Sequence, residues 1–530
     1  MNINGHNYYL KQDVKLEPLF NRWYAYPLLI APATAAMNIA NSHVKIMKSY
    51  VSAPEVHAAA CKNPAMLGGP FIDYDGKRVN EIKTLMDTTV KEQSHMIEFA
   101  RAIKSMSDIL TSEARGYSVE PLYERVPECL KGLVELNYDL NNQPSFRLIE
   151  GLLYKTRYYN PASQSVTVSL LDGDDRAFAY STPRIGGENE LHLNRPFNDE
   201  GLATFVKMRE IPQKFATIKE QLGVDDKDDE LLASFLTDEA PVKRPAYDGE
   251  QVRIRYFGHA CVLVETKDVR ILMDPVVSYD IQTDFPRYTY LDLPDTIDYV
   301  LVTHSHADHL LFETLLQLRH KIKNVVVPRN SGALEDPSLK SILHHVGFES
   351  VIEVNDMDTF AVAGGSVTAL PFLGEHADLN IRSKSGYAIQ LLGKSILCVA
   401  DSNNLDSRMY ERVHEVIGNV DVLFIGMECD GAPLTWIYGS LLTKPVDRKM
   451  DQSRRLSGSD YQRAWNMVQQ LKCKQVYVYA MGQEPWLCFL TSIKYTEQSK
   501  PIVESNKLVA ACREAGLESE RLYGCKQILL

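Results

Sequence analysis

Apolar and polar residues follow two different rhythms on either side of a polar stretch near the middle of the chain. That stretch, "TDEAPVKRPAYDGEQ" at 237–251, contains two prolines, a glycine and many charges, which is typical of a linker. Before it, apolar residues in 81–112 recur at helical spacing. Residues 164–180 alternate around Asp172-Gly173, which predicts a β-hairpin. The first part of the chain, 1–245, is therefore predicted to be an α+β domain.

After the linker, short apolar runs of strand length alternate with helical patterns. These runs lie at 253–266, 269–275, 298–304, 324–328, 366–373, 387–401, 421–427 and 475–482. A helix is predicted from Ser459, whose hydroxyl would cap it with Gln462 completing a capping box. Its apolar face is formed by Ala464, Met467, Val468 and Leu471. Many strands with helices between them favour two packed sheets flanked by helices over residues 250–530.

Composition and charge narrow the classes of partner. The formal net charge of −12 argues against a general nucleic-acid binder, because no surplus of basic residues is available to neutralise phosphates. No run of about 18 apolar residues occurs, and the N-terminal residues lack the pattern of a signal peptide. Nine cysteines are scattered without a C-x-x-C pair, which is typical of reduced thiols. We expect a cytoplasmic protein that binds neither nucleic acid nor membrane.

Metal-binding side chains are concentrated in "LVTHSHADHL" at 301–310, where a predicted strand ends. His304 and His306 alternate along an extended segment, so both can reach one ion. Asp308 and His309 follow at the predicted start of a helix and point differently, which suits a second ion beside the first. Asp401 ends the run at 387–401 and is a natural bridging carboxylate. The pattern therefore predicts a binuclear metal site.

Two adjacent residues, Glu375 and His376 in "PFLGEHADL" at 371–379, follow another predicted strand. Either side chain could complete the first metal site. If His376 is the ligand, Glu375 points away; if Glu375 is the ligand, His376 supports a ligand by hydrogen bonding. His259 and Asp274, which end the opening strands, are further candidates for such support, although both could equally be structural.

The spacing from His304 to His309, together with Asp401, resembles the motif of the metallo-β-lactamase fold. The runs at 253–266 and 269–275 resemble the opening hairpin of that fold. The resemblance covers about residues 250–530 and implies an αββα sandwich. Two features depart from the hydrolases of that fold. Glu375 stands where a histidine ligand is usual, and the late strand at 475–482 is not followed by a histidine. Ligands rich in carboxylate favour iron over zinc.

This ligand pattern, the chain length and the preceding domain resemble the aminoacyl β-hydroxylases of the chloramphenicol pathway and their relatives. The resemblance implies a diiron, O₂-dependent monooxygenase of antibiotic biosynthesis. Its substrate would be an amino acid tethered as a thioester to a carrier domain of a nonribosomal peptide synthetase. An external electron donor is also implied, and the N-terminal domain would contribute to a substrate channel and a homodimer interface.

The same resemblance implies a role for each candidate residue. One iron would take His304, His306 and Glu375, which favours Glu375 over His376 as the ligand. The second iron would take Asp308 and His309, and Asp401 would bridge the two.

Two of the candidate features and the site as a whole each have a second interpretation. Glu428, in "GMECDG", would lie near the substrate amine by the resemblance, or would be a solvated loop carboxylate. Segment 431–445 would line a substrate pocket or pack as an ordinary loop. For the whole site, the rival hypothesis is a binuclear zinc hydrolase, in which metal-bound hydroxide attacks a thioester, lactone or phosphoester.

Overall fold

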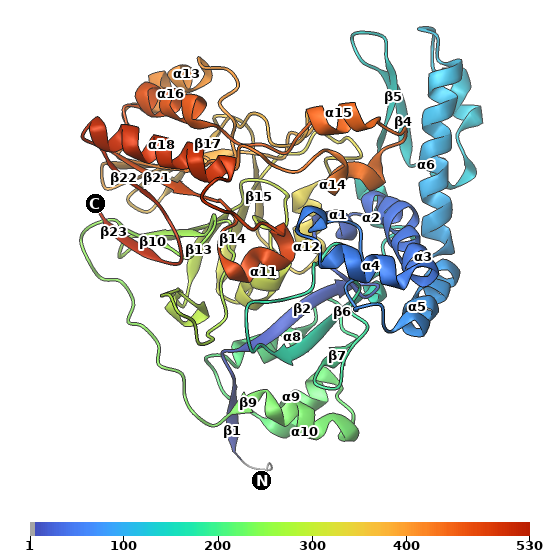
Figure 1. Ribbon diagram of the computed structural model, residues 1–530, viewed down its shortest axis with the longest axis horizontal. Coiled ribbons are helices and arrows are strands. Elements are labelled where there is room, and N and C mark those ends of the chain that lie inside the picture. Colours follow the sequence, from blue (N-terminus) through green and yellow to red (C-terminus); the bar gives the residue numbers. More distant parts are fainter. Residues whose placement is uncertain (1–5) are drawn as a thin grey trace.

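The computed structural model describes residues 6–530, in which two seven-stranded sheets pack face to face and an N-terminal part lies against their flank (Figure 1). The first sheet has the order β15-β14-β13-β12-β11-β10-β23. Its strands are β10 Arg253–Tyr256, β11 Val262–Glu265, β12 Arg270–Met273, β13 Ile297–Leu301, β14 Ile322–Pro328, β15 Val351–Val354 and β23 Lys526–Leu529. Strands β12 to β15 run parallel, whereas β23, β10, β11 and β12 are antiparallel neighbours.

The second sheet has the order β16-β17-β18-β19-β20-β21-β22. Its strands are β16 Thr359–Val362, β17 Gly365–Leu370, β18 Gly386–Leu391, β19 Lys394–Cys398, β20 Val422–Gly426, β21 Gln475–Tyr479 and β22 Glu518–Arg521. Strands β16 to β19 are antiparallel and β19 to β22 are parallel.

Apolar side chains fill three layers around these sheets. Between the sheets, Ile254, Val264, Ile389 and Phe424 belong to one fully buried core. A second core lies under α13 Met409–Ile417, α16 Tyr461–Leu471 and α18 Lys500–Glu514, on the outer face of the second sheet. The first sheet is covered by α11 Phe312–Leu318 and α12 Leu339–His345. The predicted αββα sandwich is confirmed.

The N-terminal part is α+β, also as predicted. Its strands are β1 Asn7–Leu10, β2 Val14–Phe20, β3 Trp23–Tyr24, β4 Val134–Tyr138, β5 Pro144–Leu148, β6 Gln164–Leu170, β7 Leu191–Leu193, β8 Gln213–Lys214 and β9 Leu236–Thr237. Its helices are α1 Pro27–Ile30, α2 Pro32–Asn38, α3 Val44–Ser52, α4 Pro54–Cys61, α5 Val79–Glu92, α6 Ser94–Glu113, α7 Glu150–Leu153, α8 Glu200–Lys207, α9 Phe215–Leu222 and α10 Asp229–Ser234. Residues 238–252 form no helix or strand between β9 and β10, while the limits 1–245 and 250–530 stay a prediction.

One expectation about the N-terminal part was wrong. The hairpin at 164–180 does not form, because β6 pairs with β2 and β7 instead of folding back on itself. The residues after β6 are held by long-range ion pairs: Asp174 pairs with Arg287, and Arg176 with Glu313. The helical spacing predicted over 81–112 is confirmed, as two helices, α5 and α6, that meet at Gln93.

The helix caps also differ from expectation. Helix α16 begins one residue later than predicted, with Asp460 accepting a hydrogen bond from the Arg463 N–H at 3.0 Å. Ser459 is unavailable as a cap because its hydroxyl accepts from the Asn404 N–H and donates to the Ser402 carbonyl. Helix α11 begins at Phe312, so Asp308 and His309 lie in the turn that precedes it. Among residues 6–530, no helix is both long and apolar enough to cross a membrane.

Candidate metal centre

The predicted ligands lie just beyond the ends of strands from both sheets. His304 follows β13 by three residues and forms an isolated bridge with Lys384. Asp401 follows β19, and Glu375 follows β17. Short loops after buried strands hold these side chains on a rigid scaffold, which is how functional residues are generally positioned.

The backbone around these loops is strained. His259, Asp274 and Glu375 have φ angles of 50°, 34° and 66°, and Ala400, beside Asp401, has a φ of 44°. A non-glycine residue in this left-handed region costs about 1–3 kcal/mol, and such strain is retained where the surrounding fold imposes it, commonly at functional sites. The strain therefore coincides with the residues that the sequence singles out.

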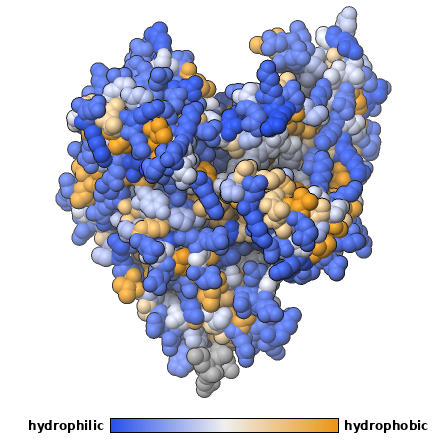
Figure 2. Space-filling view, in the orientation of Figure 1, coloured by the Kyte–Doolittle hydropathy of each residue, from blue (hydrophilic) through white to orange (hydrophobic). Residues whose placement is uncertain are grey.

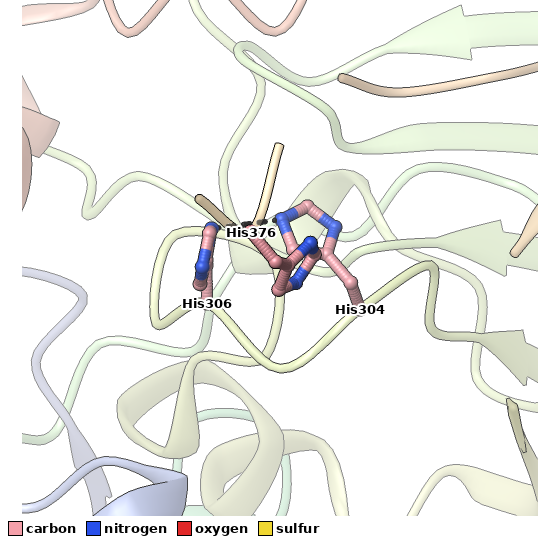
Figure 3. Close-up of side chains that lie close together, drawn as sticks. All are labelled: His304, His306 and His376. Atoms are coloured by element: carbon pink, nitrogen blue, oxygen red, sulfur yellow. Dashed lines mark hydrogen bonds between the residues drawn. The ribbon is translucent and has the colours of Figure 1, made fainter. Parts of the chain in front are cut away.

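The first group of ligand atoms is centred on His306. Its Nδ1 lies 3.1 Å from His304 Nε2 and 3.1 Å from Glu375 Oε1. Two ligand atoms about 2.1 Å from one ion, at right angles, stand about 3 Å apart. His376 joins this group, and the three imidazoles lie together (Figure 3). The geometry thus brings both Glu375 and His376 within reach of a first ion.

The second group is centred on Asp401. Its Oδ2 lies 3.0 Å from His309 Nε2 and 3.7 Å from His304 Nε2. Asp401 is therefore placed between the first group and His309, where a bridging carboxylate would stand. Asp308 and His259 also approach His309.

Hydrogen bonds fix the orientation of two of the histidines. Asp274 Oδ2 lies 2.8 Å from His309 Nδ1 and accepts the Thr303 hydroxyl at 2.6 Å. With its hydrogen on Nδ1, His309 presents a free Nε2, the arrangement that carboxylates commonly impose on metal-binding histidines. His259 is oriented differently: its Nδ1 accepts the Gly482 N–H at 3.2 Å. In the neutral ring, Nε2 therefore carries the hydrogen and faces Asp308 Oδ2 at 3.3 Å.

One residue beside the site was missed by the sequence reasoning. The hydroxyl of Tyr438, on α14 Thr435–Tyr438, lies 2.9 Å from His306 Nε2. Because His306 turns Nδ1 toward the other ligand atoms, Tyr438 holds the opposite side of its ring. The only signal in the sequence was that Tyr438 falls in segment 431–445, which was considered as a pocket wall.

The burial and the pKa shifts of these carboxyl and imidazole groups favour binding of a cation. Burial, with Asp401 and Asp308 nearby, raises the pKa of Glu375 well above its usual range. Burial and neighbouring imidazoles lower the pKa of His304 well below its usual range, and burial lowers that of His306 to about 4. In addition, His376 Nε2 and Asp401 Oδ1 are buried without a hydrogen-bond partner. Buried carboxylates and unpartnered imidazole nitrogens are stabilised when they bind a metal ion. This set of ligand atoms therefore fits a binuclear metal centre.

Glu428 lies in the loop that follows β20 and is half-buried. Burial, followed by the charges of Glu375 and Asp401, raises the pKa of its carboxyl well above the usual range. Glu428 therefore lies beside the metal-binding groups in a poorly solvated place.

A cavity of 380 Å³ reaches the site from the junction of the two parts of the chain. Its walls include Tyr26, Phe178 and Tyr180 from the N-terminal part and His306, Trp436 and Tyr438 from the sandwich. The segment 431–445 thus does line a pocket. Figure 2 shows this face of the molecule hollowed between the lobe of α13 and α16 and the lobe that carries α6.

Comparisons with known proteins support the division seen in the fold. Residues 9–241 match the family model described as the diiron non-heme beta-hydroxylase N-terminal domain, and residues 269–434 match a beta-lactamase superfamily domain. The chain is 38% identical over 529 residues to 4-amino-L-phenylalanyl-[CmlP-peptidyl-carrier-protein] 3-hydroxylase from Streptomyces venezuelae, covering 97% of this chain and 98% of the relative. The chain belongs to the diiron β-hydroxylase family.

Solved structures of this family match the whole fold. The crystal structure of CmlA, a diiron β-hydroxylase from Streptomyces venezuelae, superposes with a TM-score of 0.92 at 37% identity, covering 99% of this chain and 100% of that one. A mutant of CmlA gives a TM-score of 0.90 with the same coverage. The protein is accordingly a diiron hydroxylase, and the rival zinc hydrolase is the less supported hypothesis.

Proposed function

We propose that this diiron β-hydroxylase uses O₂ to hydroxylate the β-carbon of an amino acid held as a thioester on a carrier domain of a nonribosomal peptide synthetase, in antibiotic biosynthesis. The observation that carries the proposal is the cavity between the N-terminal domain and the sandwich, whose walls include His306. A long, narrow substrate arm can enter there. The relative from Streptomyces venezuelae, which is named for its action on an aminoacyl peptidyl-carrier-protein, is similar over nearly the whole chain.

We assign His304, His306 and Glu375 to one iron and Asp308 and His309 to the other, with Asp401 bridging. The separations of about 3 Å between ligand atoms of neighbouring residues support these groups. Glu375 is preferred to His376 because a carboxylate compensates the charge of the ion, and its Oε1 is 3.1 Å from His306 Nδ1. When bound, the two irons supply the two-electron chemistry that activates O₂.

The residues around the ligands would set up that chemistry. Asp274 keeps the hydrogen of His309 on Nδ1, and Tyr438 holds the far side of His306. The aromatic walls of the cavity exclude water from the reacting carbon. Glu428 would accept a hydrogen bond from the substrate ammonium group, whose positive charge favours the ionised carboxylate.

Three further features belong to the proposal. Two electrons per turnover come from an external reductase or small reductant, because the sequence carries no flavin or nicotinamide fingerprint. The enzyme acts in the cytoplasm, as nine free thiols favour. It works as a homodimer through its N-terminal domain.

Mass spectrometry of a loaded carrier domain tests the proposal. A carrier domain bearing 4-aminophenylalanine, tyrosine or another amino acid is incubated with iron-loaded enzyme, reductant and ¹⁸O₂. The proposal predicts that the acyl-carrier gains one ¹⁸O atom and keeps its thioester. Release of the unmodified amino acid would indicate a hydrolase instead.

A further inference from the structure

The segment that carries Glu375 has an unusual backbone, which we call the Glu375 loop and define as residues 373–379. Gly374, Glu375, Ala377 and Asp378 have φ angles of 75°, 66°, 52° and 57°. Three of these four residues carry a side chain, so their left-handed conformation is costly and persists only where the surrounding structure imposes it. The loop forms no helix or strand of its own. Contacts from other segments must therefore hold it.

Lys384 joins the Glu375 loop to the segment that carries His304. The backbone of Lys384 pairs with His304 in an isolated antiparallel bridge, and the N–H of the next residue donates to the carbonyl that precedes His304 at 2.7 Å. The side chain of Lys384 reaches the Glu375 loop, where Nζ donates to the Gly374 carbonyl at 2.8 Å. Nζ also lies 5.7 Å from the centre of the Phe372 ring. One residue thus links the segments that present two candidate ligands of the first ion.

Two other segments contact further carbonyl groups of the Glu375 loop. Arg454 donates from Nε to the Ala377 carbonyl at 2.8 Å. The N–H of Asn403 donates to the Leu373 carbonyl at 2.8 Å, and Asn403 lies two residues after Asp401. Hydrogen-bond donors from three segments outside the loop therefore hold its two ends and the residue just before Glu375.

These contacts matter because a candidate ligand atom lies on the loop. Glu375 Oε1 stands 3.1 Å from His306 Nδ1, close to the separation of about 3 Å expected for two ligands of one ion. The residues around a metal ligand must hold it within about 0.5 Å of its productive position. In a loop without regular structure, the side chains that bind its carbonyl groups must supply that precision.

We propose that Lys384 and Arg454 are positioning residues, which hold the Glu375 loop so that Glu375 and His304 reach the same iron. Lys384 sets the distance between the two ligand-bearing segments, because its backbone is paired with one and its side chain is bonded to the other. Arg454 fixes the C-terminal part of the loop through the Ala377 carbonyl. The inference rests on the proposed function, since it takes Glu375 as a ligand of the first iron.

Iron affinity, measured by competition with a chelator, tests whether these residues act through Glu375. Lys384→Met removes the hydrogen-bond donor and should weaken iron binding about tenfold, as loss of a residue that orients a ligand commonly does. Arg454→Met should weaken it in the same direction. In Glu375→Gln protein, which lacks the ligand, Lys384→Met should cause no further loss. Lys449→Met is the control and should bind iron as the native protein does, because Lys449 is exposed on α15 Arg448–Ser453.

Hydrogen exchange of the metal-free protein, followed by mass spectrometry, gives a second measurement that needs neither iron nor substrate. The peptide that covers residues 373–379 should exchange faster in Lys384→Met and Arg454→Met than in the native protein. Peptides from β20 should exchange at the native rate, which shows that the variants are folded. Arg454→Met decides the matter if Lys384→Met does not fold.

The outcomes separate the positioning role from the function on which it rests. Native iron affinity in both variants would overturn the positioning role, as would native exchange of the Glu375 loop. An equal loss of iron affinity on Lys384→Met with and without the Glu375 carboxylate would also overturn it. Hydrolysis of the thioester by native protein, together with faster loop exchange in the variants, would reject the proposed function and leave the positioning role standing.

Discussion

Tyr438 and Asp274 each contact a histidine of the candidate metal centre, at the ring nitrogen that faces away from the other candidate ligand atoms. Such partners fix the tautomer and the direction of the ring, and changing them commonly costs about 10–100-fold in metal affinity or activity. Tyr438 also lines the cavity, so a single side chain contacts both His306 and the cavity.

Tyr438→Phe should therefore weaken iron binding by about tenfold, because His306 loses the hydrogen bond at Nε2 while the aromatic wall remains. Competition with a chelator measures the iron affinity directly. Tyr180→Phe is the matched control, since Tyr180 lines the same cavity whereas the hydroxyl that contacts His306 is that of Tyr438. If the two variants hold iron equally well, Tyr438 does not position His306.

The choice between Glu375 and His376 can be settled by iron content. Glu375→Gln removes the carboxylate charge and should reduce bound iron to about one ion per chain, whereas His376→Gln should keep about two. Plasma emission spectroscopy on the two variants, prepared in parallel, measures the number of irons per chain. The opposite result would make His376 the ligand.

At the level of single residues, the sequence singled out candidate ligands that the fold brings together, where they are contiguous or follow a strand. His304 to His309 form one short motif, and Asp401 ends a predicted strand. The sequence could not reveal the contact between Tyr438 and His306, because 132 residues separate the two and only folding brings them together.

Among the elements, helix α16 begins where tertiary contacts decide. The Ser459 hydroxyl is occupied by Asn404 and Ser402, so Asp460 caps the helix. Asp460→Ala should destabilise the protein by about 1 kcal/mol, since the Arg463 N–H loses its acceptor. Urea denaturation measures the change. Glu497→Ala, at an exposed position, should leave the midpoint unchanged. If both substitutions have equal effects, Asp460 is not the cap.

The strands of the sandwich were predictable because they are apolar runs of strand length bounded by polar residues. Strand β23 was not foreseen: its sequence is short and mixed, and its pairing with β10 joins the two ends of the catalytic domain. The prediction of a hairpin at 164–180 was wrong because this segment, too, is fixed by contacts that are distant in the sequence. Its second half is fixed by Arg176, whose partners Glu17 and Glu313 are far away in the sequence.

For the whole molecule, buried ion pairs join the N-terminal domain to the sandwich. Arg176 contacts Glu17 of β2 at 2.6 Å and Glu313 of α11 at 2.8 Å, and all three side chains are buried. Helix α11 follows the metal motif directly. This network therefore connects the N-terminal sheet to the element next to the ligands.

The network makes stability depend on pH. Burial raises the pKa of Glu17, but Arg184, Lys15 and Arg176 outweigh it and hold that pKa well below the usual range. Glu17 thus contributes stability that is complete above its unfolded pKa of about 4.3 and is lost as pH falls through the lower native value. Glu17→Gln should be clearly less stable than native protein at pH 7, and thermal denaturation should show the gap closing in acid. A gap that is constant with pH would contradict this account.

Metal content tests the central claim most directly, on protein expressed with ample iron and zinc and purified without added metal. Plasma emission should find about two irons per chain and little zinc, as a diiron hydroxylase with this donor set requires. About two zincs per chain with no iron would contradict the account and favour a hydrolase.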